Sequence, residues 1–148
     1  IGRRGVPRKL GVPGEALAKV SYSLLEPEAY QGDQVLVVGG GDSAVEAAIA
    51  LADQPGNEVL LSYRRDRFSR IKSGNQQRID EAIRLGRVRV HWQTNVAEIT
   101  EDAVVLSGAG GASYRVPNSQ VFVFAGGDLP TPFLRACGIQ IETKFGER

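Results

Sequence analysis

The chain is poor in the residues that carry disulfide and metal chemistry. Its 148 residues include one cysteine, Cys137, one histidine, His91, and no methionine. A single cysteine cannot form an internal disulfide, which agrees with a reducing cytoplasmic location. A lone histidine without cysteine or carboxylate at ligand spacing gives no metal site. We therefore predict a cytoplasmic protein with no metal site and no catalytic residue, in which Cys137 and His91 are structural.

Long apolar runs and a strong charge of one sign are also missing. The formal net charge is +1, with 42% apolar and 24% charged residues, which is typical of a globular protein. This balance gives no bulk attraction to nucleic acid, and no run is long enough to cross a membrane. We therefore expect neither nucleic acid nor a membrane as a partner. Because the chain opens on Ile1 without a methionine, we expect it to be a piece of a longer protein.

The most informative segment is a glycine-rich turn that follows an apolar run. Val35–Val38 predicts a buried strand, and residues 43–52 predict a helix. Between them, Gly39-x-Gly41-x-x-Ala44 matches the dinucleotide-binding fingerprint. Gly39 permits the tight turn, Gly41 lets a pyrophosphate approach the backbone, and Ala44 lets the helix pack close to the strand. The alternative is an ordinary glycine-rich turn of an α/β protein.

The first turn of this helix favours an anion, because its backbone N–H groups have no partner within the helix. Gly40, Asp42 and Ser43 lie in or beside this turn and are candidate cofactor-binding residues. Ser43 would either cap the helix or bind the pyrophosphate, since both roles use the same N–H groups.

The remaining pattern predicts an α/β, Rossmann-like three-layer domain with a parallel sheet and an antiparallel three-strand β-meander. Strands and helices alternate at first, which indicates a parallel sheet. Short strands with tight turns then follow at about 94–117, which is typical of a meander. Residues 1–33 are expected to be irregular. The expected parallel strands are 35–38, 59–63, 88–92 and 121–124, the meander strands are 96–100, 103–107 and 113–116, and the helices are 43–52 and 75–85.

The end of the second parallel strand indicates which nucleotide binds. An NAD site usually has Asp or Glu there to bind the ribose hydroxyls. This chain has Tyr63-Arg64-Arg65 instead. Two guanidinium groups attract a 2′-phosphate through charge-assisted hydrogen bonds. The pair therefore favours NADPH over NADH, and the alternative is a solvated basic loop.

Four segments, in this order, resemble the NAD(P)H domain of the flavin-dependent pyridine nucleotide-disulfide oxidoreductases, in the thioredoxin-reductase-like branch. They are the linker Arg8–Glu15, the nucleotide turn Gly39–Glu46, the loop Tyr63–Phe68, and Val121–Gly127 followed by Pro130. Thioredoxin reductases carry a Cys-x-x-Cys pair between the first two segments, but residues 20–30 contain no cysteine. The chain therefore resembles the cysteine-free relatives, which include bacillithiol-disulfide-reductase-like proteins and ferredoxin-fused flavoproteins.

The resemblance implies roles for further residues. Tyr63 replaces the histidine of the His-Arg-Arg-x-x-x-Arg motif, and its last arginine position is Ser69, with Arg70 one residue further on. Glu46 corresponds to a glutamate near the nicotinamide, and the alternative is an exposed helix glutamate. Ala125, Gly126 and Gly127 would lie where the chain returns to the flavin domain.

The same resemblance implies a domain division and a function. Residues 1–30 would be the linker from a missing FAD domain, 31–128 the NAD(P)H-binding domain, and 129–148 the start of the return. The longer protein would pass a hydride from NADPH to FAD and on to an acceptor that the sequence does not identify, and it would form a homodimer. This chain alone would bind nucleotide without turnover. The alternatives are a non-catalytic NAD(P)-sensing regulatory module and an FAD-binding Rossmann half. Both usually keep the strand-end acid that is missing here.

Overall fold

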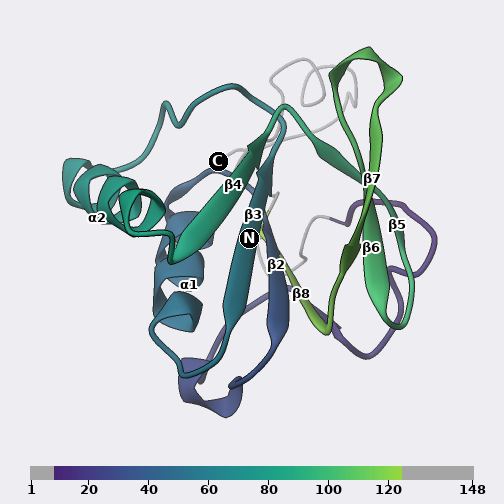
Figure 1. The fold of residues 1–148 in the computed structure, drawn as a ribbon, viewed down its shortest axis with the longest axis horizontal. Helices are drawn as coiled ribbons and strands as arrows, with labels where there is room; N and C mark the ends of the chain where they lie inside the picture. The colour runs from purple at the N-terminus through teal and green to yellow at the C-terminus, as the bar shows by residue number, and fades with distance from the viewer. Residues whose placement is uncertain (1–8, 125–148) are drawn as a thin grey trace, which may run out of the picture.

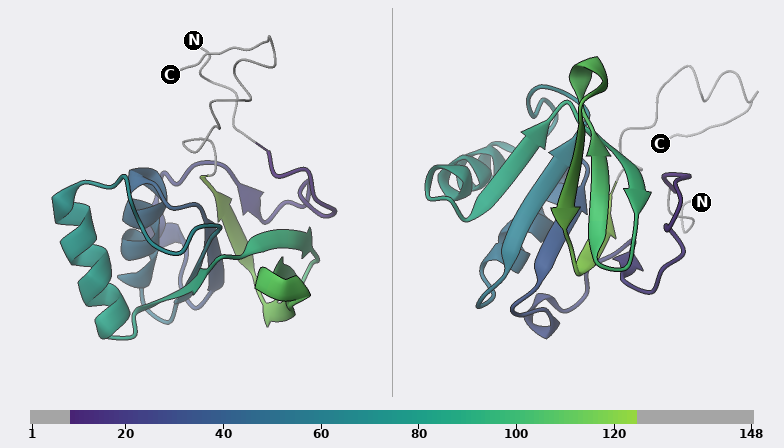
Figure 2. Two further views of the ribbon diagram at one scale, coloured as in Figure 1. Left: turned by 90° about the horizontal axis from the view of Figure 1, so that it is seen from above. Right: turned by 45° about the vertical axis from the view of Figure 1, so that its right-hand side comes forward.

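A five-stranded parallel sheet forms the middle layer of the protein in the computed structural model, which describes residues 9–124. Its strand order is β1-β8-β2-β3-β4. Two helices cover one face, and a three-stranded antiparallel sheet with the order β5-β6-β7 covers the other (Figure 1). Figure 2 shows the same three layers from above. The structure thus confirms the predicted fold class.

The elements agree closely with the predicted ranges. The parallel strands are β1 (Val20–Ser21), β2 (Gln34–Val38), β3 (Glu58–Tyr63), β4 (Val88–Trp92) and β8 (Gln120–Val123). The meander strands are β5 (Asn95–Ile99), β6 (Ala103–Ser107) and β7 (Ser113–Pro117). The helices are α1 (Asp42–Ala52) and α2 (Ser73–Arg84), with short 3-10 turns η1 (Pro27–Ala29) and η2 (Ala109–Gly111).

Strand β2 belongs to two hydrophobic cores. Val35 and Val37 pack in the core beneath the helices, whereas Leu36 and Val38 pack in the core beneath the meander. Side chains alternate between the faces of a strand, and a strand covered on both faces is apolar throughout. This explains why the strand appears in the sequence as a continuous apolar run.

The helices are positioned by small and apolar residues on one face. In α1, Ala44, Ala48 and Leu51 are fully buried against the sheet. Gly86 follows the last turn of α2 and has a φ of +77°. Its N–H donates to the carbonyl of Ile83, and the N–H of Arg87 donates to that of Ala82. These two bonds form a Schellman motif, which ends the helix close to the predicted limit at residue 85.

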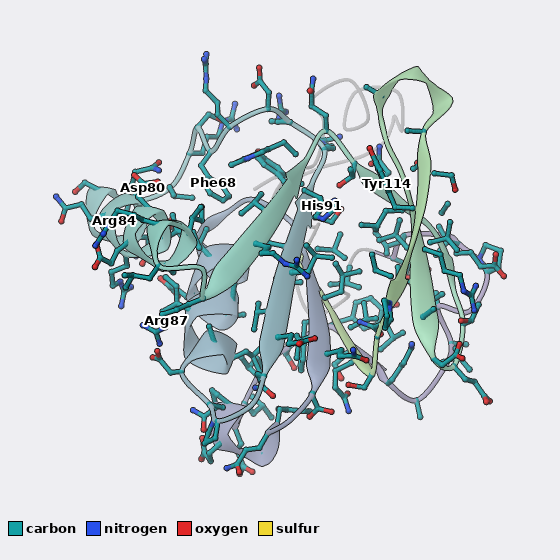
Figure 3. The ribbon with its side chains drawn as sticks, viewed as in Figure 1. Phe68, Asp80, Arg84, Arg87, His91 and Tyr114 are labelled. Carbon is teal, nitrogen blue, oxygen red and sulfur yellow. The ribbon has the colours of Figure 1, made fainter. Side chains whose placement is uncertain are left out.

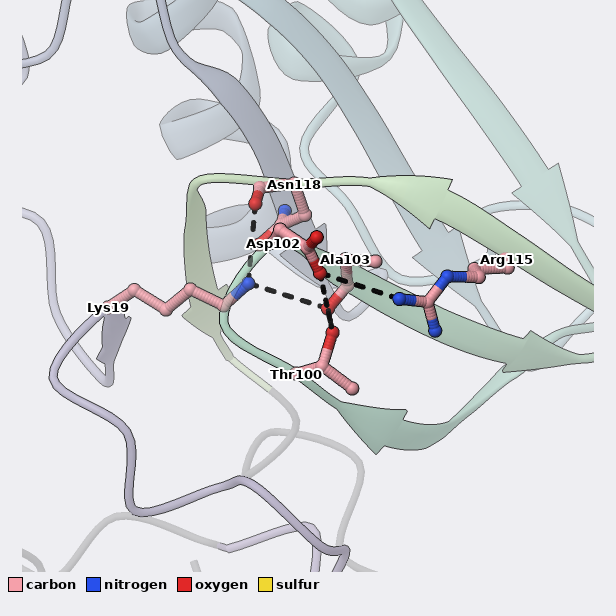
Figure 4. A network of polar contacts seen from close by, with 6 residues as sticks. All are labelled: Lys19, Thr100, Asp102, Ala103, Arg115 and Asn118. Carbon is pink, nitrogen blue, oxygen red and sulfur yellow. Dashed lines mark hydrogen bonds and ion pairs between the residues drawn. The ribbon is translucent and has the colours of Figure 1, made fainter.

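The segment before β2 is not wholly irregular, and this part of the prediction was wrong. Residues Val20 and Ser21 pair in parallel with Val121 and Phe122 at the edge of the sheet. The amine of Lys19 donates to the carbonyls of Ala103 at 3.4 Å and Asn118 at 3.3 Å (Figure 4). A strand of two residues has no readable period, so only the long-range pairing reveals it.

Residues 10–22 are also fixed to the domain at Gly14. A Cβ atom there would come within 1.7 Å of the carbonyl oxygen of Ile99 in β5. The N–H of Ile99 donates to the carbonyl of Pro13 at 2.8 Å. The segment therefore lies directly on the backbone of the meander, and only glycine fits at this contact.

Candidate nucleotide-binding site

The glycine turn lies at the carboxyl end of β2. Gly39 has a φ of +135°, and a Cβ atom there would lie 2.8 Å from the carbonyl oxygen of Phe124 and 3.2 Å from the Cβ of Ala44. The N–H of Gly39 donates to the carbonyl of Ser62 at 3.0 Å. Gly39 therefore makes the tight turn for which the sequence predicts it, and the fully buried Ala44 makes the close helix contact.

The approach to the start of α1 is open at Gly41. This residue is the N-cap, and a Cβ atom built on it would meet no atom of residues 9–124 within 4 Å. Among residues 9–124, no side chain caps this end of the helix by a hydrogen bond. Ser43 lies exposed in the first turn, so the capping alternative is not the one adopted. Within the described residues, the first N–H groups of α1 thus have no capping side chain, and this geometry favours an anion such as a pyrophosphate.

Asp42 and Glu46 are held by a residue that the sequence reading missed. Asn75 of α2 donates from Nδ2 to Asp42 Oδ1 at 2.8 Å and to Glu46 Oε2 at 2.9 Å. The backbone N–H of Lys72 donates to the same Asp42 oxygen at 2.9 Å. The Asn75 hydrogen bond, followed by that of Lys72, lowers the pKa of Asp42. Both carboxylates are therefore ordered beside the glycine turn.

The basic loop between β3 and α2 is anchored by aromatic side chains. Phe68 is 9% exposed and packs on Tyr63 and Trp92, with ring centroids 5.9 and 4.8 Å apart. The N–H of Gln93 donates to the carbonyl of Arg65 at 3.0 Å. These contacts fix the loop while Arg64, Arg65 and Arg70 remain exposed. The loop is thus an ordered cationic surface beside the glycine turn.

Tyr63 differs from the arginines that follow it. Its side chain is 4% exposed and belongs to the core beneath the helices. A Cβ atom at Gly40 would approach the Tyr63 ring to 2.3 Å, so the ring supports the turn from below. A direct contact between Tyr63 and the nucleotide stays a prediction.

A hollow of about 310 Å³ opens at the carboxyl ends of β2 and β3, on the meander side. Ser62 and Thr94 line it and share a hydrogen bond of 2.7 Å. Lys9 and Arg64 add positive charge, and Leu10 adds an apolar wall. The first described residues therefore line the same hollow as the glycine turn, a contribution that no periodic pattern in the sequence indicates.

Other predicted residues lie outside this site. The pKa of His91 is lowered by burial and then by Arg89, and its ring meets Tyr114 edge-on at 5.8 Å (Figure 3).

Within the described residues, no group of three or more His, Cys, Asp or Glu side chains is placed to hold a metal ion. Between residues 9 and 124, neither helix could span a membrane. Ala125, Gly126, Gly127 and Cys137 lie outside the described residues.

The fold and this turn define a Rossmann-like α/β domain that carries an added meander. Residues 1–146 match the pyridine nucleotide-disulphide oxidoreductase family. The chain belongs to this family, which confirms the resemblance drawn from the sequence.

Relatives of the chain include a bacilliredoxin reductase and a ferredoxin–NADP reductase. Bacilliredoxin reductase Bdr of Bacillus subtilis is 32% identical over 141 residues, which cover 95% of this chain and 43% of that protein. A ferredoxin–NADP reductase of Ignicoccus hospitalis is 28% identical over 145 residues, covering 97% of this chain and 47% of that protein. The chain thus spans less than half the length of these relatives.

Solved structures agree with the sequence matches. Bacillithiol disulfide reductase Bdr of Bacillus cereus has a TM-score of 0.78 and 32% identity, covering 92% of this chain and 42% of that one. Lactococcus lactis thioredoxin reductase has a TM-score of 0.70 and 28% identity, covering 80% of this chain and 41% of that one.

Proposed function

We propose that this chain is the NADPH-binding domain of an FAD-dependent oxidoreductase. The observation that carries the proposal is the open approach at Gly41 to an uncapped helix start, beside the ordered basic loop that begins at Arg64. Together they supply a place for a pyrophosphate and a place for a 2′-phosphate. The names of the relatives support this reading, since one of them is a ferredoxin–NADP reductase.

The residues present fit the nucleotide. The N–H groups at the start of α1 would hold the pyrophosphate, with Gly39, Gly40 and Gly41 giving the close approach. Arg64 and Arg65 would bind the 2′-phosphate, with Arg70 as a third cation. Guanidinium groups suit this role because they stay charged and donate from a rigid fork.

The chemistry would come from the cofactors, because a bound nicotinamide and a flavin supply the hydride donor and acceptor. This chain would bind and orient the nicotinamide, and Glu46 would contact its carboxamide or a lysine of the flavin domain. None of its residues need act as an acid or a base. Ala125–Gly127 would lead back to the flavin domain, which stays a prediction.

Both described ends of the chain suit a connection to a second domain. Leu10 lines the same hollow as Gly39, and Phe124 donates its N–H to the carbonyl of Val38 at 2.8 Å. Both described ends therefore lie at the carboxyl end of β2. A paired connection would let the domain rotate as a unit.

Two measurements test the proposal, both on the intact protein, meaning the longer protein that includes the flavin domain. Calorimetric titration should show tighter binding of NADPH than of NADH, and equal affinities would contradict the role of the arginine pair. The absorption spectrum should show a bound flavin. A colourless intact protein that still binds NADPH would instead support the regulatory module.

A further inference from the structure

Asn75 is a buried polar residue at the junction of the two helices. Asn75 is 3% exposed and lies in the first turn of α2. Its amide nitrogen donates to Asp42 at 2.8 Å and to Glu46 at 2.9 Å, and the Arg78 guanidinium donates to its amide oxygen. One side chain therefore contacts both helices.

The chemistry of these partners allows a single orientation of the amide. Ionised carboxylates only accept hydrogen bonds, and a guanidinium only donates them. The nitrogen of Asn75 must therefore face Asp42 and Glu46, and the oxygen must face Arg78. Every polar atom of the side chain is engaged, so the amide is fixed.

The network joins the two ends of the anion-binding surface. Asp42 follows directly on Gly41, where the pyrophosphate would approach. Lys72 ends the basic loop, and its N–H donates to the same Asp42 oxygen at 2.9 Å. The loop start is fixed separately, because the N–H of Thr94 donates to the carbonyl of Tyr63 at 3.1 Å. Asn75 therefore orients the Asp42 carboxylate that holds the Lys72 end of the loop, two residues after Arg70.

We propose that Asn75 is a positioning residue that sets the distance between the pyrophosphate site and the 2′-phosphate site, and thereby the preference for NADPH. This inference rests on the proposed function. Asn75 itself would not contact the nucleotide. It orients the Asp42 carboxylate to which the Lys72 N–H donates, so that one dinucleotide can reach both anion sites at once.

The test compares three ligands on the intact protein and on its Asn75→Asp variant. This change keeps the shape of the side chain and the Arg78 contact but removes both N–H donors, and it adds a third carboxylate. NADPH and NADH probe the dinucleotide, and 2′-AMP probes the 2′-phosphate end alone. Gln76→Ala is the matched control, because Gln76 is the next residue in α2 and its amide donates to Asp80 instead.

We expect the affinity of Asn75→Asp for NADPH to fall about tenfold or more, from the loss of hydrogen bonds to charged groups. NADH should weaken less, so the ratio of the two affinities falls, and 2′-AMP should stay within about twofold. Gln76→Ala should match the unmodified protein. A merely structural role would weaken all three ligands together through lost folded protein, leaving the ratio unchanged.

A second variant, Asn75→Ala, keeps the test decisive if Asn75→Asp fails to fold, and it should lower the same ratio. An unchanged NADPH to NADH ratio in a folded variant would overturn the inference, as would an equal loss for 2′-AMP and NADPH. If the unmodified protein binds neither NADPH nor 2′-AMP, the proposed function itself is overturned and this inference falls with it.

Discussion

The ring of Tyr63 lies against the backbone of Gly40. A Cβ atom at Gly40 would come within 2.3 Å of two ring carbons. The ring cannot move aside freely, because it packs on both Phe68 and Trp92, at 5.9 and 6.4 Å between centroids, and these two rings also pack on each other. The middle glycine of the turn is therefore required by packing rather than by its φ angle.

Replacing Gly40 with alanine should consequently destabilise the fold. Overpacking of this kind costs about 1–3 kcal/mol. Chemical denaturation would measure the loss, with Gly41→Ala as the control, since a Cβ at Gly41 would meet no described atom within 4 Å. Equal stability of the two variants would contradict the packing account. In a Tyr63→Leu background, Gly40→Ala should cost less stability than it does in the unmodified protein.

Replacing Gly41 with valine should abolish nucleotide binding and leave the fold intact. The new methyl groups would fill the space through which the pyrophosphate approaches the backbone. Circular dichroism would confirm folding, and calorimetry would measure NADPH affinity. A folded variant with normal affinity would show that the pyrophosphate binds elsewhere.

Replacing Arg64 and Arg65 with alanine should weaken NADPH and leave NADH nearly unchanged. Each lost hydrogen bond to a charged group is expected to cost about 1.5–3 kcal/mol. Arg84→Ala is a suitable control, because Arg84 is an exposed cation that pairs with Glu81 near the end of α2. If the control weakens NADPH equally, a general charge effect rather than a phosphate contact is responsible.

Stability should fall in acid through Glu15. Burial alone would raise the pKa of this carboxyl, but hydrogen bonds from the Tyr22 hydroxyl and from the N–H groups of Leu10, Gly11 and Val12 outweigh it and lower the pKa below 4.5. A lowered folded-state pKa stabilises the protein above the unfolded value, and this contribution disappears as the pH falls through the folded value.

Thermal unfolding of the unmodified protein and of Glu15→Gln across the acid range would test this. The gap in stability between them should be largest near neutral pH and should close in acid. A gap that stays constant with pH would show that Glu15 acts through shape and not through its charge.

The sequence predicted most of the fold because its signals are local. The apolar run before Gly39 and the helical spacing of Ile79 and Ile83 each fall within a few residues. The edge strand at Val20 depends instead on a partner about a hundred residues away, at Val121. No pattern near Val20 could have indicated it.

The same distinction holds for the candidate site. The glycine turn follows a spaced motif, so the tight turn at Gly39 and the close helix contact at Ala44 could be predicted from their positions alone. Asn75 lies about thirty residues from Asp42, and its role depends on how α2 packs on α1. Lys9 and Leu10 reach the hollow only because Gly14 fixes their segment on the meander.

The double burial of β2 has a consequence for how the protein unfolds. Val37 is fully buried beneath the helices, and its neighbour Leu36 is 1% exposed beneath the meander. Neither outer layer can detach without exposing one face of the same strand to water. The layers should therefore melt as one cooperative unit, and the backbone amides of β2 should exchange with solvent only through global opening.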